Sequence, residues 1–374
     1  MGKLDLLIKD FNKQYKENIV SIGLQRVEGA VLPFTSPRAN YMLYGGLPRG
    51  RLIEFAGEEG GGKTTTALDI VSNAQNIFWE EHCDEIALLE NEAKQAKDGS
   101  RLQYLRARGP KRVVYADCEN TLDEDWARLL GVNVDDMILL KPQTQTAEQI
   151  FEMLLQMIET DEVGLIVLDS LGVMLSAQAY DKTMEEKTYG GIAMALTLFS
   201  KKVGILCHKY DCTFIGINQM REDMNSQYGG QITTGGKAWK HNCSVRLLFQ
   251  KGAFIDEKGN ELKRSSETPA GNLVNISITK TKVCKPNRRT GFYTLQYTSG
   301  IDLFADVFDM AVRFALIQQA GSWFTFVDEN GEILSNDENE ILKFHGKTSV
   351  IEFLQQNEKF FTTLRKAIEK SVLR

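Results

Sequence analysis

The stretch that most constrains the fold is "GEEGGGKT", residues 57–64, which has the form G-x-x-x-x-G-K-[ST]. It follows an apolar run, "LIEFA", and opens a helix-forming run, "TTALDIVSNAQ". This order of strand, glycine-rich loop and helix is the context in which the motif binds phosphates. Glycines let backbone N–H groups turn inward around phosphate oxygens, and the helix N-terminus adds partial positive charge. A chance match in a glycine-rich turn is the alternative, and the flanking runs argue against it.

The motif also predicts what its residues do. Lys63 is expected to reach the β- and γ-phosphates of a nucleoside triphosphate, and the Thr64 hydroxyl to bind Mg²⁺. Magnesium further needs an acidic partner, usually at the end of an apolar strand. The run "VGLIVLDS" supplies Asp169, which could otherwise be an ordinary helix cap. The whole loop is expected to contact the nucleotide: Gly57, Glu58, Glu59, Gly60, Gly61, Gly62, Lys63, Thr64 and Thr65.

Hydrolysis needs one more group, which orients or deprotonates water. The run "VVYADCEN" offers Asp117 and Glu119 at the end of another apolar strand. Residues two apart point to the same side of a strand, if the strand continues. Either acid could also be a cap or a surface residue, so the spacing leaves the choice between them open.

The alternation of apolar runs with helical patterns predicts an α/β fold. Five runs are nearly continuous in hydrophobicity, which is typical of a mostly parallel sheet covered by helices on both faces. They are "RLIEFAG", "RVVYADC", "DMILLKP", "GLIVLDS" and "CTFIGIN". Three later runs are predicted to be antiparallel additions at one edge, namely "CSVRLLFQKG", "NLVNISITKTK" and "GFYTLQYTSG". The segment from about residue 302 turns helical around "SWFTFV" and predicts a small α/β domain.

Two stretches interrupt this pattern. Residues 80–110 are highly charged and helix-prone, and predict either a solvated helical insertion or a partner-binding arm. Residues 216–240 leave an apolar strand, run through some twenty polar and glycine-rich residues, and return to order at "AWKHNCSVRLLF". Loops beyond roughly 12–15 residues in compact domains are usually functional or disordered. A flexible surface loop is the plainer interpretation of the second stretch.

Charge and cysteine usage limit the partners and the compartment. The formal net charge is −6, so a nucleic acid would have to bind at a local surface. The six cysteines are scattered singly, as expected of reduced thiols in the cytoplasm. No apolar run approaches the length of a membrane span, and the charged N-terminus is unlike a secretory signal. We therefore expect a cytoplasmic protein with no membrane partner.

Several motifs, taken in order, resemble one family: the bacterial RecA recombinases and their phage relatives. The segments that carry the resemblance are "GGLPRGRLIEFAGEEGGGKTTTAL", "YADCENTLDEDWARLLGVNVDDMILLKPQT", "GLIVLDSLGVML", "INQMR…TTGGKAWKHNCSVRL", "SITKTK" and "QQAGSWFTF". The resemblance runs from about residue 30 to the C-terminus, interrupted by residues 80–110. It implies a RecA-type P-loop ATPase core. The implied domains are an N-terminal helical oligomerisation segment (1–30), the core (31–300) and a C-terminal α/β domain (301–374).

The resemblance also implies nucleotide-binding roles. Glu119 aligns with the water-activating glutamate, which favours it over Asp117. Asp123 and Trp126 fall where the family contacts adenine, with Trp126 stacking on the ring where RecA usually has tyrosine. Lys280 and Lys282 fall where a neighbouring protomer reaches the γ-phosphate. ATP would then be buried between subunits.

The long loop resembles the second DNA loop of the family. Gln219 falls where the family senses the γ-phosphate, and its amide would find no partner after phosphate release. The loop would be ordered or disordered accordingly. The predicted DNA contacts comprise charges, wedging side chains and close backbone approach: Arg221, Tyr228, Ile232, Gly235, Gly236, Lys201 and Lys202.

Together these features imply an ATP- and Mg²⁺-dependent strand-exchange protein. It would form a helical homo-polymer on single-stranded DNA, pair that strand with double-stranded DNA, and hydrolyse ATP in response to DNA. The first DNA loop of the family is expected near residues 180–202, and the helix that follows it carries Ala195 and Leu198 where RecA proteins usually present an arginine and a serine. That departure supports an alternative, an ATP-binding DNA filament protein or mediator without productive strand exchange. A RecA-fold ATPase of the helicase or clock type is a third possibility, which the "TTGGKAWK" loop and the C-terminal domain argue against.

Overall fold

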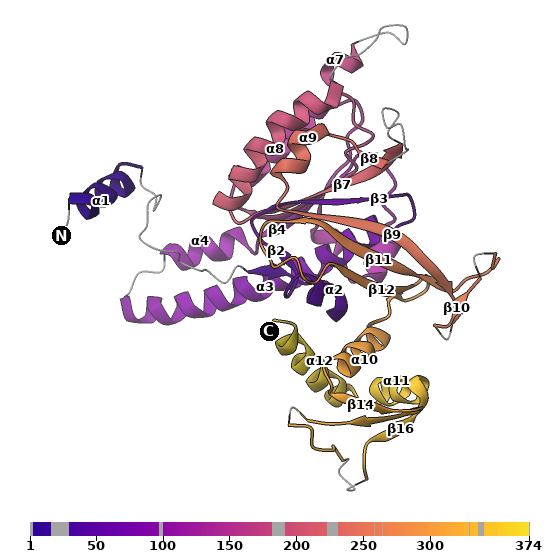
Figure 1. The fold of residues 1–374 in the computed structure, drawn as a ribbon. Coiled ribbons are helices and arrows are strands. Elements are labelled where there is room, and N and C mark those ends of the chain that lie inside the picture. Colours follow the sequence, from indigo (N-terminus) through magenta and orange to yellow (C-terminus); the bar gives the residue numbers. More distant parts are fainter. Residues whose placement is uncertain are drawn as a thin grey trace. The chain divides into compact units, whose positions relative to one another are not determined.

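The computed structural model describes residues 3–15, 30–96, 100–181, 191–222, 231–257, 259–263, 265–328, 330–335 and 340–373 (Figure 1). The chain forms two compact units, Met1–Ala30 and Val31–Arg374. In the first, helix α1 (Lys3–Tyr15) has Asp5 in its first turn and Lys13 in its last, which complements the helix dipole. In the second, a large sheet carries helices on both faces, so the prediction of an α/β fold is confirmed.

The large sheet is parallel over most of its width. Its path runs β13-β12-β11-β9-β3-β7-β6-β4-β5, and every pairing from β9 to β5 is parallel. These parallel strands are β3 (Leu52–Gly57), β4 (Arg112–Asp117), β5 (Ile138–Leu140), β6 (Val163–Asp169), β7 (Thr213–Glu222) and β9 (Val245–Ile255). The antiparallel members are β8 (Gln231–Thr233), β10 (Glu261–Leu262), β11 (Gly271–Thr281), β12 (Thr290–Gln296) and β13 (Gly300–Ile301).

One strand runs differently from the sequence-based expectation. The antiparallel arrangement begins at β11, whereas β9 lies parallel to β3. The reason is helix α9 (Gly236–Asn242), which precedes β9 and returns the chain to the end of the sheet where β3 begins. A helical crossover of this kind is what a parallel pairing requires.

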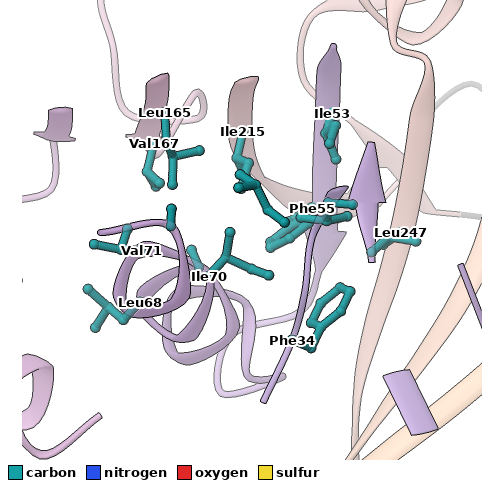
Figure 2. Close-up of a cluster of buried hydrophobic side chains, with 14 of the residues drawn as sticks. Phe34, Ile53, Phe55, Leu68, Ile70, Val71, Leu165, Val167, Ile215 and Leu247 are labelled. Atoms are coloured by element: carbon teal, nitrogen blue, oxygen red, sulfur yellow. The ribbon is translucent and has the colours of Figure 1, made fainter. Parts of the chain in front are cut away.

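Helices of the two faces bury separate sets of strand side chains. Helix α3 (Lys63–Ala96) buries Leu68, Ile70 and Val71 in one cluster with the strands, and Ile70 points towards Phe55 and Ile215 (Figure 2). The opposite face is covered by α6 (Ala147–Glu159) and α8 (Gly191–Lys209). Helix α6 begins at a Thr146–Gln149 capping box and turns one apolar face inward. Successive strand residues therefore serve opposite cores, as the strand period of two requires.

Helix α8 is long and apolar for a helix of this fold. Within the described residues it is the helix long and apolar enough to cross a bilayer. One face of it packs against the core, with Leu196, Phe199 and Val203 buried, while Met194 and Ile205 are exposed. The Phe199 ring stacks on Phe151 of α6 with 4.2 Å between centroids.

The predicted insertion forms a helical hairpin. Helix α3 continues to Ala96, and α4 (Ser100–Arg108) runs back along it. Arg101 pairs with Glu85 at 3.2 Å, and Arg106 pairs with Glu90. These exposed pairs contribute little stability, so the buried Leu89 and Leu105 hold the hairpin to a larger extent.

The C-terminal part has its own hydrophobic cluster but lies in the same compact unit as the core. Its elements are α10 (Leu303–Arg313), β14 (Ile317–Ala320), β15 (Trp323–Phe326), β16 (Lys343–His345), α11 (Gly346–Gln356) and α12 (Glu358–Val372). Arg38 joins it to the core through Asp306 at 3.2 Å and Asp309 at 2.8 Å. The short elements that complete the chain are β1 (Val31–Leu32), α2 (Pro37–Met42), β2 (Leu47–Pro48), α5 (Glu124–Leu129), a 3₁₀ turn (Val134–Asp136) and α7 (Ala177–Tyr180).

Candidate active site

A pocket of about 350 Å³ lies where β3 passes through the glycine-rich loop into α3. Such a crevice at the carboxyl ends of parallel strands is the usual ligand position in an α/β fold. The described residues that line it are Glu59, Gly60, Gly62, Lys63, Thr64, Thr65, Glu119, Trp126, Asp169, Ser170, Ile217, Gln219, Lys251, Asn272, Leu295 and Tyr297. The pocket thus brings together most of the residues proposed for nucleotide binding.

The loop conformation depends on glycine at Gly62. Its φ is +91°, and an added Cβ would lie 2.8 Å from the Val274 side chain. A larger residue would therefore be strained and would also collide with β11. Gly57 ends β3, and the Gly61 N–H donates to the Glu58 carbonyl at 3.3 Å, which closes the turn.

Lys63 is the first residue of α3, and its side chain is buried. Its ammonium donates to the Glu58 carbonyl oxygen at 2.7 Å. Burial lowers the pKa of Lys63, and the nearby carboxylates of Asp169 and Glu119 oppose that shift. The ammonium is thus held inside the loop, where phosphate oxygens could replace the carbonyl.

Thr64 and Asp169 are in direct contact at the floor of the pocket. The Thr64 hydroxyl donates to Asp169 Oδ2 at 2.8 Å, and the Tyr115 hydroxyl donates to the same oxygen at 2.8 Å. Burial raises the pKa of Asp169, while these two hydrogen bonds oppose the rise. A hydroxyl and a carboxylate side by side are hard oxygen donors, so this pair fits Mg²⁺ completed by phosphate and water.

The two acids that the sequence left open have different surroundings. Asp117 accepts hydrogen bonds from the backbone N–H groups of Thr121 and Leu122, each at 3.1 Å. Its carboxylate therefore closes the turn after β4. Glu119 lines the pocket instead, and its Oε1 accepts from Gln219 Nε2 at 3.0 Å and from the Ser170 hydroxyl.

Gln219 has a partner that the sequence analysis did not foresee. We expected its amide to lack one without a γ-phosphate, yet it donates to Glu119. The pairing arises because Gln219 of β7 and Glu119, just beyond β4, face each other across β6. Any phosphate that attracts this amide must therefore compete with a carboxylate.

The stem of the predicted DNA loop is more ordered than its composition indicated. Strand β7 continues to Glu222 and pairs with β8, so that Arg221 lies opposite Ile232. Helix α9 then begins at Gly236, with Gly235 at a φ of +100° as its N-cap. Glycine tolerates this left-handed conformation at no steric cost, which explains how the polar stretch turns into a helix. Tyr228 lies outside the described residues.

The other predicted DNA contacts lie around this stem. Arg221 is exposed and donates to the Gly172 carbonyl at 2.9 Å. Ile232 is exposed at the β8 side of the stem. Lys201 and Lys202 are exposed on α8.

The residues predicted to contact adenine sit at the start of α5. Asp123 is the N-cap, and its side chain accepts from the Trp126 backbone N–H at 3.0 Å. The Trp126 indole N–H donates weakly to the Thr65 hydroxyl at 3.4 Å, which keeps the ring at the pocket wall.

Lys280 and Lys282 lie away from the pocket lining of their own chain. The Lys280 ammonium donates to the carbonyls of Lys240 and His241 at 2.7 and 2.6 Å. Lys282 donates to His241 at 2.8 Å. Burial, then the neighbouring Lys282 charge, lowers the pKa of Lys280. The two ammonium groups thus stabilise the C-terminal end of α9.

Sequence analysis missed several pocket residues. Lys251, Asn272 and Tyr297 come from β9, β11 and the end of β12, and the Tyr297 hydroxyl donates to Asn272 Oδ1 at 2.8 Å. No local signal marks them, because Lys251 and Asn272 lie in ordinary alternating strands and Tyr297 directly follows one. Ser170 had a signal, since it directly follows Asp169.

Comparison with known proteins gives a consistent result. The family described as the RecA N-terminal domain matches residues 3–88 and 103–302. Protein RecA of Petrotoga mobilis is 29% identical over 372 residues, covering 98% of this chain and 88% of the relative. Protein RecA of Fusobacterium nucleatum is 31% identical over 287 residues, covering 76% and 65%. Protein RecA of Salinispora tropica is 29% identical over 370 residues, covering 98% and 90%.

Proposed function

The chain belongs to the RecA family, and we propose from this premise that it is an ATP-dependent homologous recombination protein. It forms a helical filament on single-stranded DNA and pairs that strand with homologous duplex. It works in the cytoplasm with Mg²⁺ and hydrolyses ATP faster when DNA is bound. Base pairing reads the sequence, while the protein holds the DNA backbone and stacking faces.

The observation that carries the proposal is the contact between Glu119 and Gln219 inside the glycine-rich-loop pocket. A protein that only binds nucleotide needs the loop and a cation site. A carboxylate held next to them, with its own orienting partners, is what water activation requires. Before ATP binds, one of these partners is the Gln219 amide, on the strand that leads into the predicted DNA loop, and the Ser170 hydroxyl remains when that amide turns to the phosphate.

The proposed hydrolysis assigns a role to each of the polar side chains in the pocket. Glu119 orients a water and accepts its proton as the water oxygen bonds to the γ-phosphorus and the bond to the β–γ bridging oxygen breaks. Lys63 leaves the Glu58 carbonyl and contacts the β- and γ-phosphate oxygens. Thr64 and Asp169 hold Mg²⁺, which supplies positive charge against the same oxygens when bound.

DNA binding is proposed to follow from Gln219. With ATP bound, its amide exchanges Glu119 for the γ-phosphate, and the loop beyond β7 orders around DNA. Arg221, Lys201 and Lys202 supply charge, and Ile232 and Tyr228 stack on or wedge between bases. The backbone at Gly235 and Gly236 approaches DNA phosphates closely.

The filament is proposed to complete the site. Lys280 and Lys282 of one protomer reach the γ-phosphate bound by its neighbour, so ATP lies between subunits. Turnover then depends on assembly, and ATPase activity should rise with protein concentration.

The test combines ATPase rates, with and without single-stranded DNA, with a three-strand exchange assay. Lys63→Ala serves as the negative control for nucleotide-dependent steps. Stimulated hydrolysis together with exchange supports the proposal. Stimulated hydrolysis without exchange supports the mediator alternative, which Ala195 and the exposed Leu198 of α8 favour. ATPase activity indifferent to DNA refutes both.

A further inference from the structure

The carboxylate of Glu54, on β3, is fully buried and accepts hydrogen bonds from three side chains. Its Oε1 accepts from Asn218 Nδ2 at 2.8 Å and from the Trp239 indole N–H at 3.0 Å. Its Oε2 accepts from the Arg246 guanidinium. A buried carboxylate is tolerated only when such donors surround it. Removing one donor therefore alters the strength of its hydrogen bonds to the remaining donors.

Each donor adjoins a residue that the proposed function uses. Asn218 immediately precedes Gln219 in β7. Trp239 lies in α9, the helix that follows the loop stem. Arg246 stands opposite Lys280 in the β9–β11 ladder. One carboxylate on β3 therefore connects the strand before the loop, the helix after it and the edge that carries the bridging lysines.

Asn218 also joins β7 to the residues just before α9, and this junction is called the seam below. Asn218 Nδ2 also donates to the Thr234 carbonyl at 2.8 Å. Among the described residues, however, Asn218 Oδ1 and the Thr234 hydroxyl are buried and make no hydrogen bond. Buried polar atoms without partners are rare and costly in native proteins. A second arrangement of the seam that pairs them would relieve this cost, so the seam has a physical reason to adopt two states.

We propose that Glu54, with Asn218 and Trp239, is a positioning device that makes γ-phosphate sensing and loop ordering one concerted change. None of the three lines the nucleotide pocket, and none belongs to the predicted DNA contacts. They act through Gln219 on one side and through α9 on the other. The inference rests on the proposed function, because it assigns the regulation of that same site.

A purely structural role predicts a different outcome from a coupling role. Trp239→Phe removes the indole donor and keeps an aromatic ring in the core. Ser36→Ala is the matched control, because it too removes one buried donor from a buried carboxylate, that of Asp306. Both variants should lose some thermal stability, and only Trp239→Phe should alter communication between ATP and DNA.

The first measurement is single-stranded DNA affinity by fluorescence anisotropy, with a non-hydrolysable ATP analogue and with ADP, at fixed salt. Trp239→Phe and Asn218→Ala should lower the ratio of the two affinities by at least about fivefold. Affinity for a fluorescent ATP analogue should stay within about twofold of the parent, and Ser36→Ala should keep the parent ratio. Retention of the full ratio by both variants overturns the inference.

The second measurement follows the fluorescence emission of Trp239 as nucleotide binds, in the absence of DNA. The chain has four tryptophans, and Trp79→Phe, Trp126→Tyr and Trp323→Phe leave Trp239 as the reporter. The ATP analogue should shift its emission and ADP should not, and adding Glu54→Gln should abolish the shift. An emission spectrum indifferent to nucleotide overturns the inference.

The two measurements also separate this inference from the proposed function. If the parent protein binds DNA equally with the ATP analogue and ADP, the proposed function fails. In that case the inference is judged by the Trp239 emission alone: a shift with the ATP analogue and not with ADP supports it, and no shift overturns it.

Discussion

Replacing Gln219 with alanine should uncouple ATP from DNA. In the structure its amide donates to Glu119 at 3.0 Å from a strand that continues into the loop stem. With ATP bound, the same amide is proposed to donate to the γ-phosphate. Alanine can do neither, so the loop loses the contact that distinguishes ATP from ADP. The P-loop is untouched, and ATP binding should survive.

The magnitude follows from an exchange of two similar bonds. A hydrogen bond to a charged acceptor is worth about 1.5–3 kcal/mol. Because Gln219 gives up a carboxylate to gain a phosphate, only the difference between the two bonds can favour the ATP state. We expect at most about 1.5 kcal/mol, which is up to about a 13-fold loss in the ratio of DNA affinities.

The assay is anisotropy of a labelled single strand, titrated with a non-hydrolysable ATP analogue or with ADP at one salt concentration. Arg221→Ala is the matched control, because Arg221 lies two residues further along the same face of β7. It should weaken DNA binding equally with both nucleotides. If Gln219→Ala keeps the parent's preference for the ATP state, the loop is not switched through this residue.

Three further tests concern the choice of the base, the lysines of the neighbouring protomer and the buried carboxyl of Asp69. Glu119→Gln should bind ATP and form long-lived filaments without hydrolysing ATP. Asp117→Asn should keep ATP hydrolysis and lower the melting temperature. If ATPase assays show the opposite pattern, Asp117 is the base. Lys280→Ala with Lys282→Ala should remove DNA-stimulated ATPase, with partial rescue on mixing with Glu119→Gln protein, and full activity of a dilute monomer would contradict an intersubunit site. Burial raises the pKa of Asp69 from 3.8 to about 6. The folded state therefore keeps a proton that the unfolded state releases between about pH 4 and 6, and this group costs up to about 3 kcal/mol of stability as pH rises through that window. Asp69→Asn should thus raise the melting temperature at pH 7.5 more than at pH 4.5, and an equal shift at both would refute the assignment.

Local pattern was enough to predict the fold class and to mark the glycine-rich loop as a candidate phosphate site. The parallel strands read as continuous apolar runs because both of their faces are buried. The turn between β3 and α3 is equally local, since glycines and a helix start lie within a few residues of each other. The family resemblance, carried by the same motifs, is confirmed by the match to the RecA N-terminal domain.

Spacing could not separate Asp117 from Glu119, because both acids follow the same strand. The difference lies in distant partners: the Glu119 side chain meets Ser170 beyond β6 and Gln219 on β7. The direction of β9 likewise depended on where α9 returns the chain.

The sequence by itself determined that apolar strands alternate with helices in an α/β order, and it predicted the glycine-rich loop as the place where a nucleotide phosphate binds. Only the tertiary structure decided that Glu54 meets Asn218, Trp239 and Arg246, and that Lys251 and Tyr297 line the pocket beside the glycine-rich loop. Periodicity reports the face on which a side chain lies. It does not report which strand lies next in the sheet, and strand order is what brings hydrogen-bonding groups from distant parts of the chain within 3 Å of each other.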